Sequence, residues 1–193
     1  MQPLSRKDLF SLEQYAEKRQ EFRAQVMAHK RNRKVAIGPH ATLYFEDRLT
    51  MQYQVQEMLR VECIFEPAGI EEELAAYNPL IPDGSNWKAT FMIEYEDADE
   101  RRDALARLVG IEDKVWIQVG AQDKVYAVAD EDLDRAAANK TASVHFLRFQ
   151  LTPAMAAEVK AGGAVRAGID HSEYRHEVDV DPAARNALAS DLA

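Results

Sequence analysis

Residues 35–65 read VAIGPHATLYFEDRLTMQYQVQEMLRVECIF, and this stretch decides the fold. Two runs of strand-forming residues, 35–37 and 43–45, flank Gly38-Pro39, a dipeptide that is typical of a hairpin turn. Asp47 stands at the position of a helix N-cap, because its carboxylate can accept hydrogen bonds from the free N–H groups of a first helical turn. Apolar residues then recur every three or four positions, so we expect a long helix after the hairpin. One face of this predicted helix contains Met51, Val55, Met58, Leu59, Glu62 and Phe65.

The same helix carries many polar residues for a segment with a continuous apolar face. They are Gln52, Gln54, Gln56, Glu57, Arg60 and Glu62. Either the helix packs in the core with one solvated face, or it lines a binding site. Glu57 and Arg60 are three positions apart and can form an ion pair. Partly buried, such a group can act as a general base or bind an anion, but it can equally be a structural link between helix and sheet.

The chain before this stretch predicts further helix. Ser5 with Asp8 and Ser11 with Gln14 are capping-box pairs, so we expect a short helical turn followed by a restart. The apolar spacing that follows predicts a helix of about five turns. This helix ends at a basic patch, residues 29–34 (HKRNRK). Cations at this place offset the negative end of the helix dipole; the alternative interpretation is a patch that binds nucleic acid or phosphate.

The second half of the chain alternates strand and helix signals. Strands are predicted at 87–95, 114–119, 124–128, 143–151 and 164–169, and helices at 70–77, 97–109, 130–138, 152–161 and 182–192. Residues 120–123, GAQD, connect two of these strands as a hairpin. Residues 170–180 are polar and fit neither pattern.

Helices first, followed by strands that single helices interrupt, indicate the α+β class. We expect the N-terminal helices and a β-hairpin to pack on a mainly antiparallel sheet formed by residues 87–170. At 193 residues the chain is expected to form a single domain, 1–193, with a helical sub-lobe, 1–80, and a sheet-rich sub-lobe, 87–193.

Charge and composition exclude several function classes. The net charge of −9 argues against a general nucleic-acid or anionic-membrane partner, because such binding is driven by neutralising phosphate groups. No run approaches 18 consecutive apolar residues, and the N-terminus, MQPLSRKDLF, lacks the apolar core of a signal peptide. We therefore expect a cytoplasmic protein with no membrane partner. Cys63 is the sole cysteine, which excludes an intramolecular disulfide and a cysteine-ligated zinc or iron–sulfur site within one chain.

The histidines supply the candidate chemistry. His171 and His176 frame a carboxylate in a stretch that can ligate a metal, although an ordinary polar loop has the same composition. His145 and Arg148 stand in a strand of aromatic residues, where they could bind an anion or form a surface pair. The sequence contains no HExxH, Glu-x-x-His, P-loop, G-x-S-x-G or G-x-G-x-x-G motif. Cys63 has no adjacent base. These patterns leave the reaction, the substrate and any cofactor unknown.

Four stretches together resemble one protein family. They are RKVAIGPHATLYFEDRLTMQYQVQEMLRVE (33–62), LVGIEDKVWIQVG (108–120), VYAVADED (125–132) and KTASVHFLRFQLTPAM (140–155). In their order and spacing, and over almost the whole chain, they resemble the uncharacterised bacterial family catalogued as domain of unknown function 3501. The resemblance implies no reaction, cofactor or catalytic residue. It implies genes beside those for a rubrerythrin-like protein and an iron–sulfur oxidoreductase, a setting that points to redox metabolism or peroxide defence.

Stretches that look like signatures of this family are 45–48, 54–60, 145–148 and 170–171. Their polar members are the candidates for a shared pocket. The predicted ligand-binding residues are Arg48, Gln54, Glu57, Arg60, His145 and Arg148, and the predicted metal ligands are His171 and His176.

The first hypothesis is an accessory or binding protein of a cytoplasmic redox or peroxide-defence system. It would contact an iron–sulfur oxidoreductase or a rubrerythrin-like partner through its helical lobe. The alternative is a small-molecule or metal-dependent enzyme, which requires several polar residues to converge on one pocket. Those residues are Arg48, Glu57, Arg60, His145 and His171. A third hypothesis is nucleic-acid binding through residues 29–34, and the exposed-helix pattern is also compatible with a homodimer.

Overall fold

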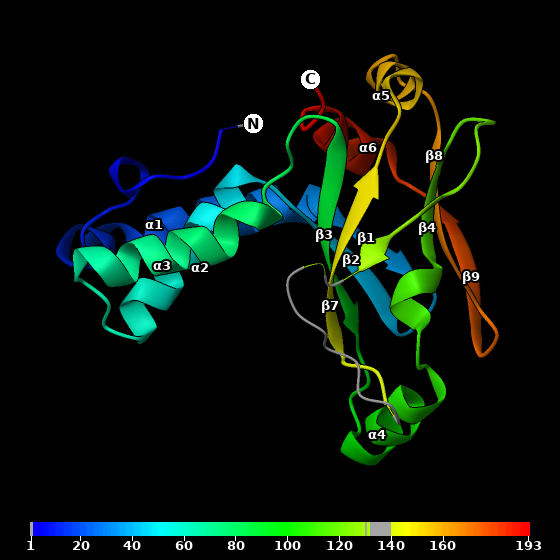
Figure 1. Cartoon of the computed structure of the whole chain (residues 1–193), viewed down its shortest axis with the longest axis horizontal. Coiled ribbons are helices and arrows are strands. Elements are labelled where there is room, and N and C mark those ends of the chain that lie inside the picture. Colours follow the sequence, from blue (N-terminus) through cyan, green and yellow to red (C-terminus); the bar gives the residue numbers. More distant parts are fainter. Residues whose placement is uncertain (1, 130, 132–139) are drawn as a thin grey trace.

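The molecule consists of a helical lobe beside two antiparallel sheets that face each other (Figure 1). This computed structural model describes residues 2–129, 131 and 140–193. The α-helices are α1 (Leu12–Lys30), α2 (Arg48–Val61), α3 (Pro67–Tyr77), α4 (Ala98–Arg107), α5 (Pro153–Lys160) and α6 (Pro182–Ala189). Short 3₁₀ helices are η1 (Arg6–Asp8), η2 (Arg31–Arg33), η3 (Asn78–Leu80) and η4 (Ile111–Lys114). The fold is therefore α+β, as predicted.

Helices α1, α2 and α3 form the helical lobe, and an apolar stripe of each helix faces its interior. The predicted caps begin the first two helices. Ser11 Oγ accepts the N–H of Gln14 at 3.3 Å, and Asp47 Oδ1 accepts the N–H of Thr50 at 2.9 Å. The buried apolar residues are Tyr15, Phe22 and Val26 of α1, Met51, Val55 and Leu59 of α2, and Leu74 of α3. The apolar spacing of α1 therefore predicted its buried face.

Helix α2 is shorter than its apolar pattern predicted. It ends at Val61, so Glu62 lies beyond the helix, and Phe65 is 68% exposed. Cys63 has a positive φ of 52° in the turn that follows. Helix α3 then begins at Pro67, where the missing N–H of proline removes no helical hydrogen bond. The turn between these two helices thus ends the apolar face and leaves Phe65 outside it.

The first sheet has the strand order β1-β2-β3-β7-β6 within the described residues. Its strands are β1 (Lys34–Ile37), β2 (Ala41–Glu46), β3 (Asn86–Ile93), β7 (Val144–Gln150) and β6 (Val128–Ala129). The predicted hairpin supplies β1 and β2, and Gly38 in its turn has a φ of 70°. A Cβ at this position would lie 2.6 Å from the ring of His176. Glycine is therefore required both by the turn and by the close approach of another strand.

The second sheet has the order β5-β4-β8-β9. Its strands are β5 (Val125–Tyr126), β4 (Val115–Val119), β8 (Val165–His171) and β9 (Tyr174–Asp179). The predicted hairpin around residues 120–123 is present, but its second arm is divided: Tyr126 pairs with Trp116 of β4, whereas Val128 pairs with Arg148 of the first sheet. The polar stretch 170–180 forms the end of β8 and the edge strand β9. The expected single sheet is thus two sheets.

The main core lies between the two sheets. Strand alternation sends Trp87, Ala89, Phe91 and Ile93 of β3 inward. They pack in one cluster with inward residues of the second sheet, among them Val115, Ile117 and Val119 of β4 and Val165, Ala167 and Ile169 of β8. This core covers one face of the first sheet, so the opposite face of the sheet is the one left to contact the rest of the molecule.

Helices close the ends of this two-sheet body. Helices α5 and α6 lie at one end and α4 at the other (Figure 1). The indole N–H of Trp87 donates to the carbonyl oxygen of Leu188 in α6 at 3.0 Å, which ties this helix to the core. The predicted helix 130–138 lies outside the described residues. Within the residues that are described, none of the helices combines the length and the apolarity that crossing a bilayer requires.

Candidate ligand-binding site

The outer face of the first sheet turns away from the core and toward the helical lobe. Pairing of β2, β3 and β7 places Tyr44, Thr90 and Phe146 in one cross-strand row on this face. Glu46 follows Tyr44 by two positions, so its side chain emerges on the same face. This face carries both aromatic and polar groups, as expected of a surface that is neither core nor fully solvated.

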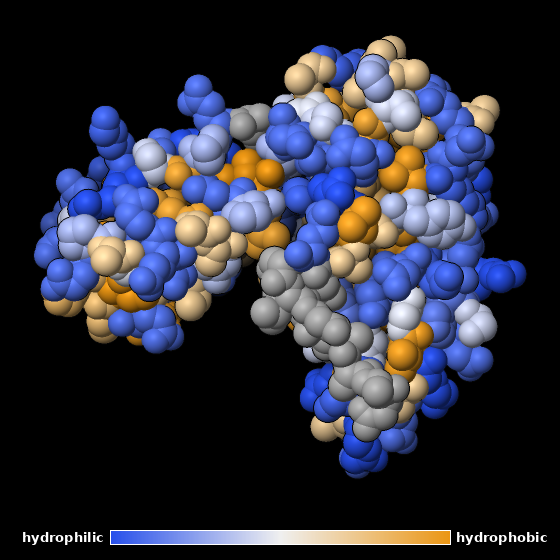
Figure 2. All heavy atoms as spheres, viewed as in Figure 1, coloured by the Kyte–Doolittle hydropathy of each residue, from blue (hydrophilic) through white to orange (hydrophobic). Residues whose placement is uncertain are grey.

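A cavity of about 400 Å³ separates the lobe from this face, and we call it the inter-lobe crevice. Its lobe wall contains Met27, Lys30, Met51, Gln54, Tyr77 and Leu80, and its sheet wall contains Tyr44, Glu46, Thr90, Met92, Val144 and Phe146. Figure 2 shows apolar surface in the angle where the lobe meets the sheets. The volume falls in the range of small-molecule sites, about 300–1,000 Å³. The crevice can therefore hold a small organic molecule between two walls.

Glu46 is the unusual group of the crevice. Its side chain is buried, with 5% of the residue exposed. Oε1 accepts a hydrogen bond from Thr90 Oγ1 at 2.7 Å. Oε2 is also buried, and it has no hydrogen-bond partner within the part of the chain that the structure describes. A buried acceptor without a partner costs about 1–3 kcal/mol, so native proteins retain few of them.

The rest of the crevice wall is mostly apolar and soft. Met27, Met51 and Met92 contribute thioethers, which are flexible and polarizable. Tyr44 and Phe146 contribute aromatic rings. Such a wall accepts an apolar body of varied shape, while Glu46 offers one hydrogen-bond acceptor at a fixed position. Chemically, the arrangement fits the binding of an organic molecule that carries a hydrogen-bond donor.

A smaller cavity of about 160 Å³ lies next to the crevice, and Leu80 and Phe146 line both. Its polar wall consists of Lys88, Glu131 and Arg148. Arg148 binds the two carboxylate oxygens of Glu131 at 2.7 and 2.8 Å. This hydrogen bonding lowers the pKa of Glu131 and raises the pKa of Arg148. The charge of Arg148 is thus paired inside the chain.

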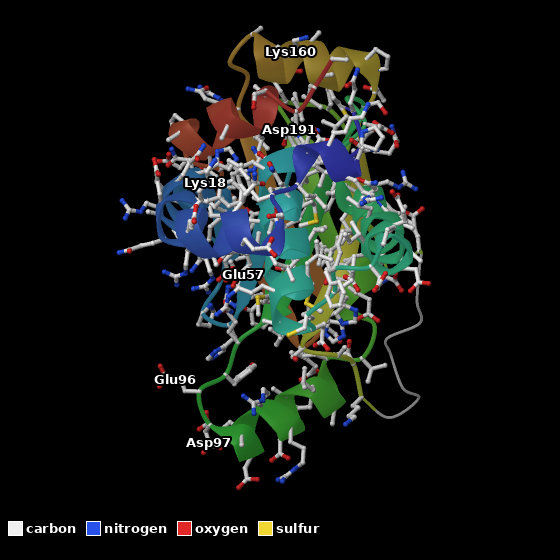
Figure 3. All side chains as sticks on the ribbon, turned by 90° about the vertical axis from the view of Figure 1, so that its left-hand side faces the viewer. Lys18, Glu57, Glu96, Asp97, Lys160 and Asp191 are labelled. Carbon is white, nitrogen blue, oxygen red and sulfur yellow. The ribbon has the colours of Figure 1, made fainter. Side chains whose placement is uncertain are left out.

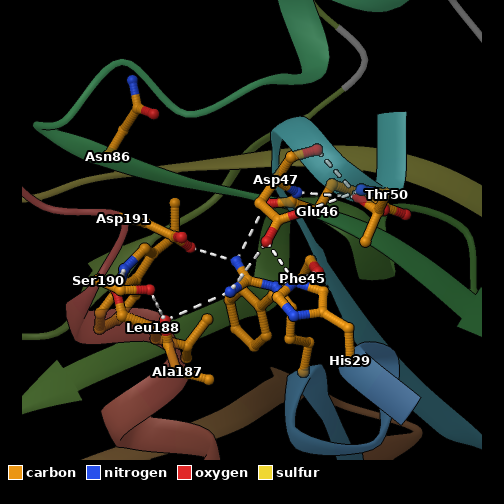
Figure 4. Close-up of polar contacts among 12 residues, drawn as sticks. His29, Phe45, Glu46, Asp47, Thr50, Asn86, Ala187, Leu188, Ser190 and Asp191 are labelled. Carbon is orange, nitrogen blue, oxygen red and sulfur yellow. Dashed lines mark hydrogen bonds and ion pairs between the residues drawn. The ribbon is translucent and has the colours of Figure 1, made fainter. Parts of the chain in front are cut away.

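Beside the crevice, a buried ionic cluster joins the lobe, the first sheet and the C-terminal helix (Figure 4). Arg33 is 1% exposed, and its guanidinium donates to three backbone carbonyl groups at distances of 3.1 to 3.3 Å. It also pairs with Asp191, and it lies 3.4 Å from Asp47 Oδ2. That oxygen is 2.5 Å from His29 Nε2. We call His29, Arg33, Asp47 and Asp191 the junction cluster.

The pKa values of the two carboxyl groups in the junction cluster are shifted in opposite directions. Burial raises the pKa of Asp191 from 3.8 to about 6, against the opposing charge of Arg33. Burial acts on Asp47 too, but the charge of Arg33 and the hydrogen bonds from Thr50 and His29 outweigh it and lower the pKa. The predicted basic patch, residues 29–34, includes Arg33 of this cluster. Because Arg33 is buried and paired with carboxylates, it is not available to bind a phosphate group.

Two of the predicted ligand-binding residues line the inter-lobe crevice or the smaller cavity beside it. Gln54 lines the crevice and Arg148 lines the smaller cavity. Arg48 lies elsewhere, at the start of α2, where it pairs with Asp8 at 2.6 Å and donates to the carbonyl oxygen of Gln2 at 3.2 Å. Arg48 thus holds the N-terminal segment against the lobe.

Glu57 faces another helix of the lobe, and its ion-pair partner is Arg19 of α1, while Arg60, three positions away, contributes to its pKa only through its charge. Arg19 of α1 binds both carboxylate oxygens of Glu57 at 2.8 Å, and the hydroxyl of Tyr15 donates to it at 2.6 Å. These contacts cross-link α1 to α2, whereas Arg60 is exposed. Arg19 lowers the pKa of Glu57, while burial and the hydrogen bond to Glu57 raise the pKa of Tyr15. Figure 3 shows Glu57 among the helices of the lobe.

His145 and Arg148 do not form one site, because they project from opposite faces of β7. His145 is fully buried on the core side, whereas Arg148 lies on the outer face. His145 Nε2 is 2.8 Å from Thr141 Oγ1, and that hydroxyl donates to Glu112 Oε2 at 3.0 Å. All three residues are buried, so this polar group anchors the chain near η4.

The predicted metal ligands lie on the second sheet. Both ring nitrogens of His171 contact backbone groups, the Val109 carbonyl oxygen and the Glu173 N–H, each at 3.2 Å. His176 is exposed, and its ring meets that of Tyr174 at 4.7 Å. Among residues 2–129, 131 and 140–193, no group of three or more His, Cys, Asp or Glu is placed to hold a metal ion. Metal binding through these histidines stays a prediction.

The polar pocket that the enzyme hypothesis requires is not assembled from its five residues. His145 and His171 lie in the two-sheet body, while Arg48, Glu57 and Arg60 lie on α2. Glu46 is not in the list of predicted ligand-binding residues, although the polar members of its stretch were candidates for a shared pocket. It belongs to the signature-like stretch 45–48, and its alternation with Phe45 and Tyr44 places it on the outer face. Nothing in the sequence indicates that one of its oxygens lacks a partner.

Comparisons with known proteins give a family and a structural relative. The family model described as "Protein of unknown function (DUF3501)" matches residues 3–192. A crystal structure of a "novel protein of unknown function" from Burkholderia pseudomallei K96243 is similar to this chain, with 52% identity, a TM-score of 0.95 and coverage of 100% of both chains. No curated protein matches the chain.

Proposed function

The chain belongs to the DUF3501 family, and we propose that it is a binding protein whose ligand occupies the inter-lobe crevice. The observation that carries this proposal is Oε2 of Glu46, a buried acceptor without a hydrogen-bond partner in the described residues, at the wall of a cavity of about 400 Å³. A donor from a bound molecule would satisfy this oxygen and offset the desolvation cost of burying it.

The architecture supports the same proposal. One wall of the crevice is a sheet face held by the main core, and the other wall belongs to the helical lobe. Sites between two such bodies are a common place for small ligands, because each body supplies part of the contact surface. A ligand would therefore also bridge the lobe to the sheet.

Methionine methyl resonances provide the test. Met27, Met51 and Met92 line the crevice, whereas Met58 and Met155 do not and serve as internal controls. Titration of methyl-labelled protein with benzyl alcohol, benzylamine or indole should shift the three crevice resonances and leave the two controls in place.

A blocking variant completes this test. Val144→Trp fills the crevice from β7 and should abolish the shifts, whereas Ala36→Trp on exposed β1 should not. If none of the three probes shifts Met27, Met51 or Met92, or if Val144→Trp has no effect, the crevice is not a binding site.

A second proposal concerns a protein partner, and the end of the helical lobe favours it. Val61 and Phe65 are 62% and 68% exposed there, beside a cavity of about 360 Å³ that Phe65 lines. Glu62 and Glu66, both exposed, flank these apolar side chains. Arg60, also exposed, and Arg6, which lines the cavity, complete the rim, so the patch is complementary to an apolar partner surface whose rim carries charges of both signs.

We propose that this patch docks the iron–sulfur oxidoreductase or the rubrerythrin-like protein that the family resemblance suggests, in an accessory role in redox metabolism or peroxide defence. Calorimetric titration of each purified partner, under anaerobic conditions, tests the idea. The double variant Val61→Ser/Phe65→Ser should weaken the complex at least about tenfold, the effect of losing one apolar anchor. Val109→Ser, at another exposed valine, is the matched control. Absence of a complex with either folded partner would contradict the proposal.

A further inference from the structure

We infer that the ligand class of the inter-lobe crevice is an organic cation, a protonated amine with an apolar body, whose N–H groups bind Oε2 of Glu46. This inference rests on the proposed binding function and names its ligand. It follows from which groups at the site can donate, which can accept, and what surrounds them.

The first step concerns the free oxygen. Glu46 Oε1 already receives the hydroxyl proton of Thr90, at 2.7 Å. Oε2 remains, and a carboxylate oxygen only accepts. A ligand group placed against it must therefore donate, and a second carboxylate or a phosphate would be repelled. Among donors, a cationic N–H forms hydrogen bonds to a carboxylate that are roughly twice as strong as neutral ones.

The second step concerns the cations of the protein itself. Lys88, which is paired across the strands with Glu46, forms an ion pair with Glu131 at 3.9 Å. Lys34 has its ammonium 5.4 Å from the centre of the Tyr44 ring. Lys30 lines the crevice, yet Oε2 of Glu46 has no hydrogen bond to it. Among residues 2–129, 131 and 140–193, cations thus lie around this carboxylate, but none of them forms a hydrogen bond to its Oε2.

The third step concerns the walls. The rings of Tyr44, Tyr77 and Phe146 line the crevice together with the three methionine thioethers. Aromatic faces attract an ammonium group electrostatically, most strongly where water is excluded. The same rings and thioethers also accept the hydrocarbon part of an amine. A small aromatic or alkyl amine matches both the acceptor and its surroundings, whereas a sugar or a nucleotide would leave many polar groups unpaired against apolar walls.

Two probes of nearly equal shape test the inference. Benzylamine and benzyl alcohol differ at the group that would meet Glu46, and both can be titrated while the Met27, Met51 and Met92 resonances are followed. Benzylamine should bind at least about tenfold more tightly, the effect of one charge-assisted hydrogen bond.

Substitutions at two carboxylates sharpen the comparison. Glu46→Gln keeps the side-chain shape and should bring the affinity ratio of the two probes close to one. Glu94→Gln is the matched control, because Glu94 accepts a hydrogen bond from Thr42 at 2.8 Å much as Glu46 does from Thr90, but Glu94 is exposed. It should leave the ratio unchanged.

The outcomes separate the two proposals. If both probes shift the crevice methionines with equal affinity, the crevice binds ligands but the preference for a cation is wrong. The same conclusion follows if Glu46→Gln leaves a tenfold ratio intact. If neither probe shifts them, the proposed binding function itself fails. The probe comparison in the unsubstituted protein is decisive by itself, so the inference stays testable even if Glu46→Gln does not fold.

Discussion

Glu46 and Asp47 are adjacent in the chain, and both are buried, but their surroundings differ completely. Asp47 caps α2, contacts His29 and faces Arg33, so its oxygens are occupied by the fold. Glu46 points to the other side, where one oxygen accepts the hydroxyl of Thr90 and the other is buried beside the crevice, with no hydrogen-bond partner among the described residues. A buried carboxylate whose oxygens all have hydrogen-bond or ion-pair partners stabilises the fold, whereas a buried carboxylate with an unpaired oxygen can bind a donor from a ligand. The junction cluster and the crevice should therefore respond to mutation in opposite ways.

The largest effect is expected at the centre of the junction cluster. Arg33→Met leaves Asp47 and Asp191 buried without their cation, so it should lower the free energy of unfolding by about 3–5 kcal/mol. Urea denaturation followed by circular dichroism measures the change. Arg31→Met, at an exposed arginine of the same 3₁₀ helix, is the control. A loss below about 1 kcal/mol would show that the cluster is not stabilising.

The next largest effect is expected in the pH dependence of the free energy of unfolding. The folded-state pKa of Asp191 is about 6, above its ordinary value of 3.8, so between these values the native protein binds this proton more tightly than the unfolded chain does. Stability from this group is therefore present below about pH 4 and lost as the pH rises to about 6, by on the order of 3 kcal/mol. The lowered pKa of Asp47 acts in the opposite direction, but at pH values below this window.

Asp191→Asn removes the titrating group. The free energy of unfolding of the unsubstituted protein, minus that of this variant, should fall by the same amount between pH 4 and pH 7. Urea denaturation at several pH values measures the difference. A difference that stays constant, or that rises with pH, would contradict the assignment.

At the crevice the expected sign is reversed. Glu46→Leu removes a buried acceptor without a partner, at the cost of one hydrogen bond from Thr90, so it should stabilise the protein by about 1 kcal/mol. The same variant should lose the preference for benzylamine. Glu94→Leu, at an exposed carboxylate, should change stability by less than about 0.5 kcal/mol. Destabilisation by Glu46→Leu would place Glu46 with the structural carboxylates.

The smallest effect is expected where an ion pair is partly solvated. The Arg19 side chain is 35% exposed in its pair with Glu57, so Arg19→Ala should lower the midpoint of thermal unfolding only slightly, and less at high salt. Arg23→Ala, at an exposed arginine of the same helix, is the control. Thermal unfolding at low and high ionic strength distinguishes the two variants. If Arg19→Ala destabilises the protein as much as Arg33→Met does, the expected difference between solvated and buried ion pairs is wrong.

Features that depend on near neighbours in the chain could be predicted from the sequence. The caps at Ser11 and Asp47 and the turn at Gly38-Pro39 involve groups within a few residues of each other, and all were predicted correctly. The division of the second hairpin arm was not predictable, because Tyr126 and Val128 find partners in different sheets that only the whole fold brings together.

In the candidate site too, only the features that depend on near neighbours in the chain could be predicted. His145 and Arg148 differ by an odd number of positions on one strand, so their separation onto opposite faces could have been read from alternation. The pairing of Glu57 with Arg19 could not, since it depends on how α1 packs against α2. The unpaired oxygen of Glu46 was even harder to predict, because recognising it requires the positions of all the described elements around it, none of which supplies a hydrogen-bond donor.

The contact between Arg33 and Asp191 spans 158 positions of the chain, which has a consequence for synthesis. At roughly 5–20 residues per second, a ribosome needs about 10–30 s to make the residues between them. During that time the nascent lobe holds a guanidinium whose strongest partner does not yet exist. A chain interrupted before residue 191 would leave Asp47 as the only acidic partner of Arg33 within the junction cluster, so we expect the junction of an unfinished chain to be less stable than that of the complete one.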